Sequence, residues 1–449
     1  MISDRLRQAL RLGDIEGRYD GWLLGAVAAL VAIGVVMVAS SSIGVAARLE
    51  VGSFYFLTKH LAFLAFGLFG ALVISRIELR ALERRGPVLL LFALALLVLV
   101  LVPGIGSEVN GARRWINLGV AGFQAVEAVK VVLILWLAGY LVRHREQVQN
   151  TWWGLIKPSV IAGAMVMLLL LQPDFGSAAL ICAIVAGMVF LGGVRIANLI
   201  APTLIVLPAM ALLAMSEPYR VRRLTSFLDP WSDPFDKGFQ LTQALIAIGR
   251  GEWFGVGLGA SVQKLSFLPE AHTDFIFAVI AEETGFIGVL VIIGLFALLV
   301  GRGFWLGLSA MEAKRPFAGY CAFGISLWIG MQAFVSIGVN LGLLPTKGLT
   351  LPLISAGGSS VLMTCVAVGL LLRVSYEVDR THRQLARIRQ NAAAVEPPRE
   401  GQIPVPPAER PHPRPVEAAP RPRLLPVPPS LDAASARSGR IEPTLGAIG

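Results

Sequence analysis

Acidic side chains and a histidine are grouped in one segment of the chain, residues 268–285, with the sequence LPEAHTDFIFAVIAEETG. The segment continues into the apolar run FIGVLVIIGLFALLV, so these groups lie at, or inside, the edge of a helix that could span a bilayer. A charge inside a bilayer costs about 2.5–3.5 kcal/mol on the insertion scale, so such residues are candidates for proton transfer or substrate binding. The candidates in this segment are Glu270, His272, Asp274, Glu282 and Glu283.

Asp274 has two interpretations. It follows Thr273 after a Pro-containing loop and precedes an apolar run, where an aspartate often caps the free amides of a helix. Alternatively, it forms a cluster with Glu270 and His272 at the outer mouth of a site for an anionic, lipid-linked substrate. The arginines expected on the same side could bind that substrate or lipid headgroups; they are Arg113, Arg114, Arg220, Arg222 and Arg223.

Other charged residues also fall within apolar segments. Glu127 and Lys130 are three residues apart and therefore share one helical face, and Asp174 lies in the turn QPDFG. A neutralised cluster in a water-accessible cavity and a structural ion pair between helices both explain Glu127 and Lys130. Glu282 and Glu283 are expected roughly 12 Å below Asp274, paired with basic residues and shaping a polar cavity.

A further segment rich in small residues has the sequence GVNLGLLPTKGLTLPLISAGGSS, from position 338 to 360. Small residues at a helix start permit close approach of a ligand or of another helix, and helix packing is the commoner reason. Lys347 could bind phosphate or the headgroup zone. The candidates here are Asn340, Lys347, Ser355, Gly357, Gly358 and Ser359.

The elements that carry these residues are membrane helices. The chain has 449 residues, of which 55% are hydrophobic and only 15% charged, too few polar groups to cover a soluble protein of this size. We therefore predict an all-α polytopic membrane protein. Its net charge of +10 is assigned to basic cytoplasmic loops rather than to nucleic-acid binding. Cys182, Cys321 and Cys365 fall in apolar segments without metal spacing, so they are interpreted as small buried residues.

About ten spans are predicted, at approximately 21–42, 56–75, 87–103, 124–142, 155–171, 175–194, 197–215, 274–300, 317–338 and 351–373. The distribution of Arg and Lys in the short connections places both termini in the cytoplasm. Residues 1–20 then form a cytoplasmic segment, 21–375 the membrane domain and 376–449 a Pro- and Arg-rich tail expected to be disordered. Residues 216–273 form a long, structured outer loop with a short amphipathic helix at 240–248 on the membrane surface.

Several motifs together resemble the SEDS family (shape, elongation, division and sporulation) of bacterial wall-building membrane proteins. They are FLPEAHTDFIFAVIAEETGFIG, GVNLGLLPTKGLTLPLISAGGSS, ARRWINLGVAGFQAVEAVK and QPDFGSA. The motif PTKGLTLPLIS is more similar to the division-type branch than to the elongation-type branch. Two positions depart from the family pattern: FQAVE replaces the usual FQPSE, and Ala356 replaces an aromatic residue.

The resemblance implies a peptidoglycan glycosyltransferase that polymerises lipid II into β-1,4 glycan strands at the outer face of the bacterial cytoplasmic (inner) membrane, at the division septum. Asp274 is then the base of an inverting displacement, and Arg113, Arg114, Lys130 or Lys347 would bear the pyrophosphate, with Trp115 in the same motif. Implied partners are a class B penicillin-binding protein (FtsI-type transpeptidase), other division proteins and membrane lipids. A divalent cation, Mg²⁺ or Mn²⁺, is compatible with this chemistry, but no motif requires one. The alternatives are a lipid II flippase and a non-catalytic scaffold that activates the penicillin-binding protein.

Overall fold

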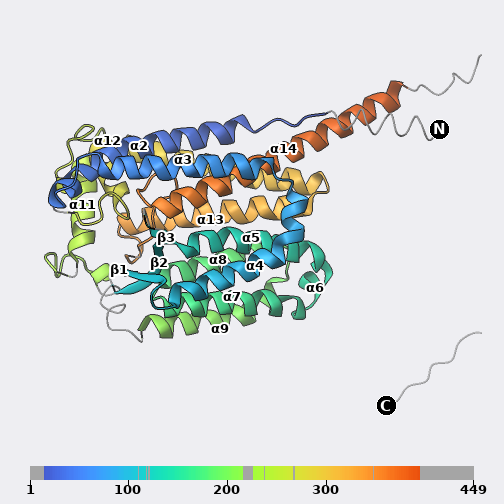
Figure 1. The fold of residues 1–449 in the computed structure, drawn as a ribbon, viewed down its shortest axis with the longest axis horizontal. Helices are drawn as coiled ribbons and strands as arrows, with labels where there is room; N and C mark the ends of the chain where they lie inside the picture. Colours follow the sequence, from blue (N-terminus) through green and yellow to red (C-terminus); the bar gives the residue numbers. More distant parts are fainter. Residues whose placement is uncertain are drawn as a thin grey trace, which may run out of the picture. The chain divides into compact units, whose positions relative to one another are not determined.

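The computed structural model describes residues 15–394, except positions 110, 118, 120, 121, 216–225, 237, 266, 267 and 347. Within them the chain is mostly helical (Figure 1), as expected from its apolar runs. The helices are α2 (Gly21–Arg48), α3 (Tyr55–Arg76), α4 (Leu79–Leu101), α5 (Ala125–Arg143), α6 (Arg145–Asn150), α7 (Trp153–Leu171), α8 (Phe175–Leu191), α9 (Ile196–Met215), α11 (Phe239–Gly251), η1 (Gln263–Leu265), α12 (Ile276–Glu312), α13 (Pro316–Asn340) and α14 (Gly358–Ala394).

Each predicted span coincides with a helix. Among the described residues, eight helices are long and apolar enough to cross a membrane, and α8 is a shorter apolar helix of 17 residues. Several boundaries differ by about two turns or more. The helix α4 begins at Leu79 and accommodates Pro87 in its interior, α12 continues to Glu312, and α14 begins at Gly358 and continues past the apolar segment to Ala394. The additional turns contain charged residues, which favour a helix as well as apolar residues do. Hydropathy alone therefore predicted helices that are too short.

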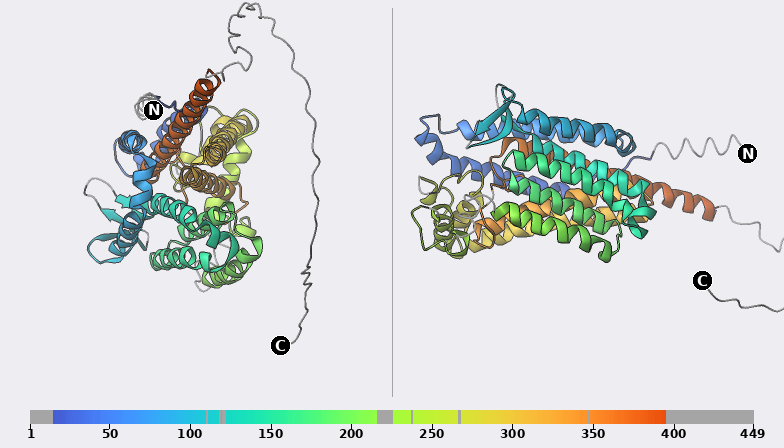
Figure 2. Two further views of the ribbon diagram at one scale, coloured as in Figure 1. Left: turned by 90° about the vertical axis from the view of Figure 1, so that its right-hand side faces the viewer. Right: turned by 90° about the horizontal axis from the view of Figure 1, so that it is seen from below.

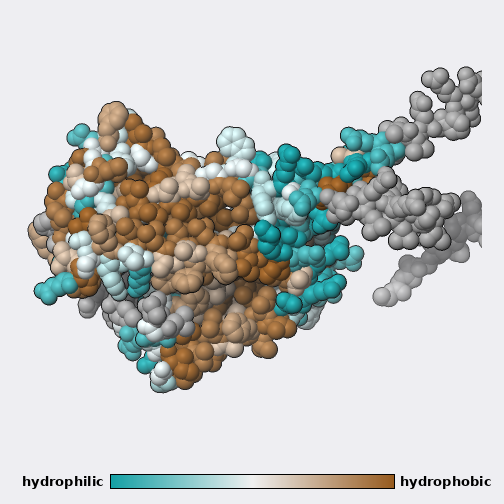
Figure 3. All heavy atoms as spheres, turned by 45° about the horizontal axis from the view of Figure 1, so that its top comes forward, coloured by the Kyte–Doolittle hydropathy of each residue, from teal (hydrophilic) through white to brown (hydrophobic). Residues whose placement is uncertain are grey.

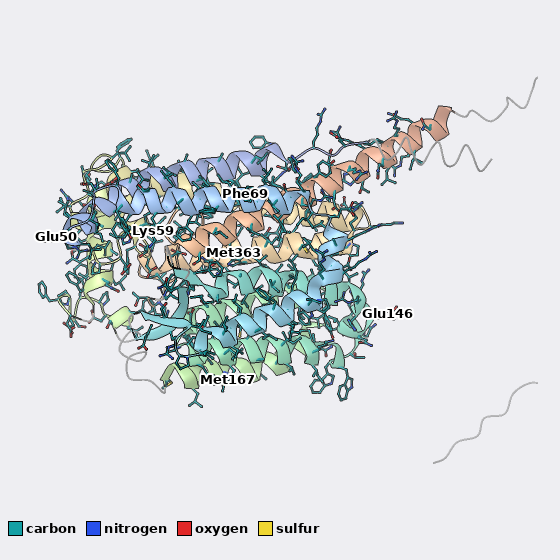
Figure 4. All side chains as sticks on the ribbon, in the orientation of Figure 1. Glu50, Lys59, Phe69, Glu146, Met167 and Met363 are labelled. Carbon is teal, nitrogen blue, oxygen red and sulfur yellow. The ribbon has the colours of Figure 1, made fainter. Side chains whose placement is uncertain are left out.

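The long helices lie nearly parallel in a bundle, with β1–β3 and α11 at one end and α6 at the other (Figures 1 and 2). Apolar side chains form a broad surface between more hydrophilic ends in Figure 3. Figure 4 shows the same order: exposed Glu50 and Glu146 lie at opposite ends, and Phe69 and Met167, 66% and 61% exposed, lie between them. Such an exposed apolar belt suits a lipid environment.

The end that holds α6 is tied together by ion pairs between distant parts of the sequence. Asp20 accepts a bond from Arg302 at 2.7 Å, and Glu377 pairs with both Arg315 and Arg373. Asp20 also caps α2 by accepting from the Leu23 amide. These ion pairs hold the start of α2 against α12 and hold α14 against the start of α13. The candidate site lies at the opposite end of the bundle.

A small antiparallel sheet, which hydropathy did not predict, lies in the segment expected to face outward. Strands β1 (Gly106–Val109), β2 (Ala112–Asn117) and β3 (Gly122–Gln124) pair in the order β1-β2-β3. They are too short and too rich in Gly and charged residues for an alternating pattern to be recognised. Arg113 pairs with Glu108 and Trp115 with Ser107, and Arg114 lies between them where the register shifts, so the sheet positions all three residues shortly before α5.

The helix α12 is interrupted at Gly285, with φ 67° and ψ −167°, which separates a short piece, Ile276–Thr284, from the long remainder. The outer loop fits into this break: the Val256 amide donates to the Glu282 carbonyl at 2.9 Å, and the Phe286 amide donates to the Glu252 carbonyl at 2.9 Å. A Cβ at position 285 would lie 2.3 Å from the Gly255 nitrogen, so only glycine fits. The apolar sequence continues on both sides of Gly285, so hydropathy did not predict this break.

Candidate active site

A cavity of about 1110 Å³ opens at the end of the bundle that carries the sheet. Its walls come from the first turns of α3, from the sheet, from the starts of α8 and α14, and from the segments 269–275 and 345–350. Several residues predicted from widely separated motifs are brought together on these walls: Arg114, Trp115, Asp174, Glu270, His272, Asp274, Gly357, Gly358 and Ser359.

Asp274 is held through the backbone on both sides of it. The carbonyls of His272, Thr273 and Asp274 each accept a hydrogen bond from a residue in the segment 340–356, at 2.9, 2.7 and 2.9 Å. The donors are the Ala356 amide, the Ser355 hydroxyl and the Asn340 side-chain amide, respectively. Asn340 and Ser355 are buried and do not line the cavity, so they fix the position of the aspartate.

The turn before α12 brings Asp274 to the cavity wall. Glu270 has a φ of 55°, and its carbonyl accepts bonds from the Thr273 and Phe275 amides at 3.1 and 3.2 Å. Phe275, rather than Asp274, occupies the capping position of α12. The Asp274 carboxylate approaches Gly348, where an added Cβ would lie 3.5 Å from Oδ2. The carboxylate thus faces the 345–350 segment of the cavity.

His272 lies beside Asp274 in the same wall, partly buried, with its ring centroid 4.8 Å from that of Phe56 on α3. Within the described residues its Nδ1 has no hydrogen-bond partner. Burial lowers the pKa of His272 below its ordinary value; Glu270 opposes this shift, and the positive charges of Arg48 and Lys59 add to it. A neutral imidazole beside Asp274 can accept or donate a hydrogen bond to a polar substrate.

Asp174 has a capping role in addition to its place on the cavity wall. It precedes α8, and its carboxylate accepts bonds from the Ser177 amide at 3.1 Å and the Ser177 hydroxyl at 2.8 Å. Gln124, at the end of β3, donates to the same carboxylate at 3.4 Å. These bonds hold Asp174 at the start of α8, between that helix and the end of β3.

Glu127 and Lys130 lie behind the cavity wall and do not line it. Lys130 is fully buried, donates to Glu127 at 2.9 Å and to Gln332 Oε1 at 2.8 Å, and lies 4.8 Å from the centre of the Trp328 ring. Gln332 in turn donates to the carbonyl of Thr350, a cavity residue, at 3.0 Å. The ion pair thereby supports the cavity wall from inside the bundle.

Glu282 and Glu283 also lie outside the cavity lining and bind the outer loop instead. Glu282 accepts bonds from Arg250 at the end of α11 and from Ser261, at 2.9 and 2.5 Å. Glu283 pairs with Lys264 at 2.7 Å. The basic partners were expected, but these carboxylates fasten the loop to the piece of α12 that follows Asp274.

The remaining predicted residues are placed as follows. Arg113 does not line the cavity and lies 3.6 Å from Glu108 across the β1–β2 pair. Lys347 and the outer-loop arginines Arg220, Arg222 and Arg223 lie outside the described residues. In the part of the chain that the structure describes, no three His, Cys, Asp or Glu side chains are grouped so as to hold a metal ion. The amphipathic segment 240–248 forms α11, which packs along α12.

Lys59 and His60 on α3 line the cavity, although no sequence motif identified them. Figure 4 shows Lys59 toward the end of the bundle that holds Glu50. Glu127 and Lys130 were identified because they are ionisable side chains inside an apolar span. The same criterion applies to Lys59 and His60 and could have identified them.

Residues 21–380 match the family model of the cell cycle proteins FtsW, RodA and SpoVE, which covers the whole bundle and the site. This chain belongs to the FtsW/RodA/SpoVE family. The family is the one that the motifs resemble, so that prediction is confirmed, and the chain is a multi-pass membrane protein.

Relatives and solved structures agree with this assignment. A probable peptidoglycan glycosyltransferase FtsW from Xanthomonas oryzae pv. oryzae is 60% identical over 397 residues, 88% of this chain and 81% of the relative. A relative of the same description from Legionella pneumophila is 50% identical, over 80% of this chain and 91% of its own length.

Two solved structures share the fold. One, described as "structural coordination of polymerization and crosslinking by a peptidoglycan synthase complex", has a TM-score of 0.65 and 34% identity over 80% of this chain and 98% of that chain. The rod shape determining protein RodA of Thermus thermophilus has a TM-score of 0.59 and 33% identity, over 80% of this chain and 96% of its own.

Proposed function

We propose that this chain is a peptidoglycan glycosyltransferase of the division type, which polymerises lipid II at the outer face of the bacterial cytoplasmic membrane during septal wall synthesis. The observation that carries the proposal is the location of Asp274. It lies on the wall of a cavity large enough for a lipid-linked disaccharide, and basic residues of that cavity can meet the diphosphate. The names of the FtsW relatives support the same activity.

Asp274 acts as the general base in this proposal. Its carboxylate takes the proton from the 4-hydroxyl of the acceptor sugar as that oxygen attacks the anomeric carbon of the donor. The bond from that carbon to the phosphate oxygen breaks, so an α-linked donor gives a β-1,4 linkage with one inversion. The fixed backbone at positions 272–274 keeps the carboxylate in place without reorganisation during the reaction.

Lys59 and Arg114 would stabilise the departing diphosphate. Both line the cavity, and a cationic group near a leaving phosphate lowers the free energy of the charge that develops on it. Arg113 has a carboxylate neighbour in Glu108, so Arg114 is the better candidate of the adjacent pair. A divalent cation would supply the same kind of charge stabilisation, but within the described residues no three His, Cys, Asp or Glu side chains are grouped so as to hold one.

The partner proposed for this activity is a class B penicillin-binding protein that cross-links the new strands. The fold shared with a chain of a peptidoglycan synthase complex supports such a partner. Membrane lipids, lipid II and other division proteins complete the proposed environment. In this arrangement both termini lie in the cytoplasm and the cavity faces outward.

The test is polymerisation of purified lipid II by the full chain reconstituted with its penicillin-binding partner, whose own transglycosylase capacity is absent. Lipid II supplied only on the outer face should be converted to glycan strands, with the polyprenyl diphosphate released in equal amount. A flippase would move lipid II and leave it unpolymerised. A scaffold would make strands only when another polymerase is added. Either result would contradict the proposal.

A further inference from the structure

His60 is a buried side chain of the cavity wall for which the mechanism above has no role. It is 3% exposed and lies on α3, five residues after the helix begins. Across the described residues, neither its Nδ1 nor its Nε2 has a hydrogen-bond partner. Buried polar atoms in folded proteins nearly always have one. An imidazole that lines a cavity and has no partner among the described residues is a candidate to bind the occupant of that cavity.

The surroundings of His60 place it close to the reacting end of the cavity. Phe56, His60 and Phe63 are spaced by four and three residues, so they share one face of α3. The Phe56 ring lies 4.8 Å from the ring of His272, two residues before Asp274. Phe63 packs against the start of α14, since a Cβ at Gly358 would lie 2.5 Å from its ring. His60 therefore lies between the loop that carries Asp274 and the first turn of α14.

The chemistry of this wall favours an uncharged polar group. A neutral imidazole offers one donor and one acceptor, which matches a hydroxyl or an amide. Phe56 and Phe63, on either side of it along α3, also line the cavity and provide flat apolar surfaces. The positive charges suited to a diphosphate are elsewhere in the lining, on Lys59 and Arg114.

We propose that His60 is a substrate-binding residue that hydrogen-bonds a hydroxyl or amide of the sugar part of the lipid-linked substrate, not its diphosphate. The inference rests on the proposed function for the identity of the substrate, and it adds a specific contact on α3. The substrate would also provide partners for the two imidazole nitrogens that have none among the described residues.

The test compares two ligands that differ in the sugar. The full chain carrying Asp274→Asn, which prevents turnover, is reconstituted in nanodiscs and titrated with lipid II or with undecaprenyl pyrophosphate while thermal stability is followed. Adding His60→Leu should weaken lipid II binding roughly tenfold, the loss expected for one or two hydrogen bonds, and leave undecaprenyl pyrophosphate binding unchanged. The ligand-free melting temperature should stay equal or rise, because an unsatisfied buried polar group has been removed.

Two further variants serve as controls. His60→Gln, which keeps a donor and an acceptor, should retain most of the lipid II affinity. Thr58→Val, on the exposed side of the same turn of α3, should change the binding of neither ligand. In the wild-type chain, His60→Leu should raise KM for lipid II about tenfold with a smaller change in kcat.

Several outcomes would overturn the inference. Equal lipid II binding by His60→Leu, or a loss of ligand-free stability with unchanged binding, would mean that water or the protein satisfies the imidazole. An equal loss for both ligands would place the contact at the diphosphate. Absence of lipid II binding to the parent chain would also contradict the inference. Binding without polymerisation by the wild-type chain would instead refute the proposed function and leave the His60 contact standing.

Discussion

Two buried ionic clusters, each built on a lysine paired with a glutamate, hold different parts of the molecule. Lys130 pairs with Glu127 at 2.9 Å, and Lys264 pairs with Glu283 at 2.7 Å; the lysines are 0% and 3% exposed. The first pair lies inside the helix bundle and is linked to Gln332 on α13. The second joins a short turn of the outer loop to α2, through Ser40, and to α12.

The difference shows that burial alone does not determine what an ion pair contributes. Breaking the Lys130 pair leaves a carboxylate inside packed helices, and water reaches it only if the bundle opens. Breaking the Lys264 pair leaves a carboxylate under a loop, which can open locally at a lower free energy. The two clusters should therefore differ in the size of the loss and in the region that loosens.

The largest effect is expected for Lys130→Met. The variant leaves Glu127 buried without its cation and should lower the free energy of unfolding by about 3–5 kcal/mol. Thermal unfolding in detergent, followed by size-exclusion chromatography, measures the loss. The double variant Lys130→Met with Glu127→Leu should recover much of it, because no buried charge remains. A single variant as stable as wild type would remove the distinction between the clusters.

A smaller, local effect is expected for Lys264→Met. Opening of the loop should limit the loss to about 1–3 kcal/mol, and hydrogen exchange should accelerate at residues 252–265 while α5 and α13 stay protected. Lys157→Met, at an exposed position on α7, serves as the control and should change neither quantity. Accelerated exchange throughout the bundle would show that this pair supports the whole fold, as the Lys130 pair does.

Gln332→Leu tests the connection between the inner cluster and the cavity. It removes the bonds to Lys130 and to the Thr350 carbonyl, so we expect a loss of about 1–2 kcal/mol and a several-fold drop in turnover. Ser336→Ala, one turn away on α13, removes a buried hydroxyl for which the described residues supply no partner, and should be near neutral. Normal turnover in Gln332→Leu would show that the cluster stabilises the bundle without supporting the cavity.

The smallest effect is expected from His272, which belongs to neither cluster. Its pKa in the folded protein is lowered by burial below 6.5, so the unfolded chain binds more protons as the pH falls through that value. Stability should therefore decrease below pH 6.5, and His272→Gln should lose that part of the pH dependence. Melting temperatures measured from pH 5 to 8 provide the test. An unchanged profile in the variant would mean that another group titrates.

The sequence predicted the helices well because lipid-facing segments need long apolar runs, which hydropathy detects directly. It also predicted Asp274, Glu270 and His272 as one cluster, because they are neighbours in the chain. The small sheet was missed because its strands are too short for an alternating pattern to be recognised, and the break at Gly285 because the apolar run continues through it. The tail from residue 395 lies outside the described residues, and its expected disorder stays a prediction.

Contacts between residues far apart in the chain could not be predicted from the sequence. Lys264 is 19 residues from Glu283 and 224 from Ser40, and nothing in their spacing indicates contact. Asn340 and Ser355 were predicted as candidates for substrate binding or for the cavity, and their hydrogen bonds to the carbonyls of Asp274 and Thr273 could not be read from the sequence. Lys59 and His60 were missed because no motif surrounds them, although both are ionisable side chains inside an apolar segment, a feature that could have identified them.

The central claim is that Asp274 removes a proton from the acceptor sugar inside the outer cavity. Polymerisation of lipid II by Asp274→Asn, compared with wild type under identical reconstitution, tests it most directly. The variant should fold, bind lipid II and make no glycan strands. Substantial polymer from that variant would show that Asp274 is not the base.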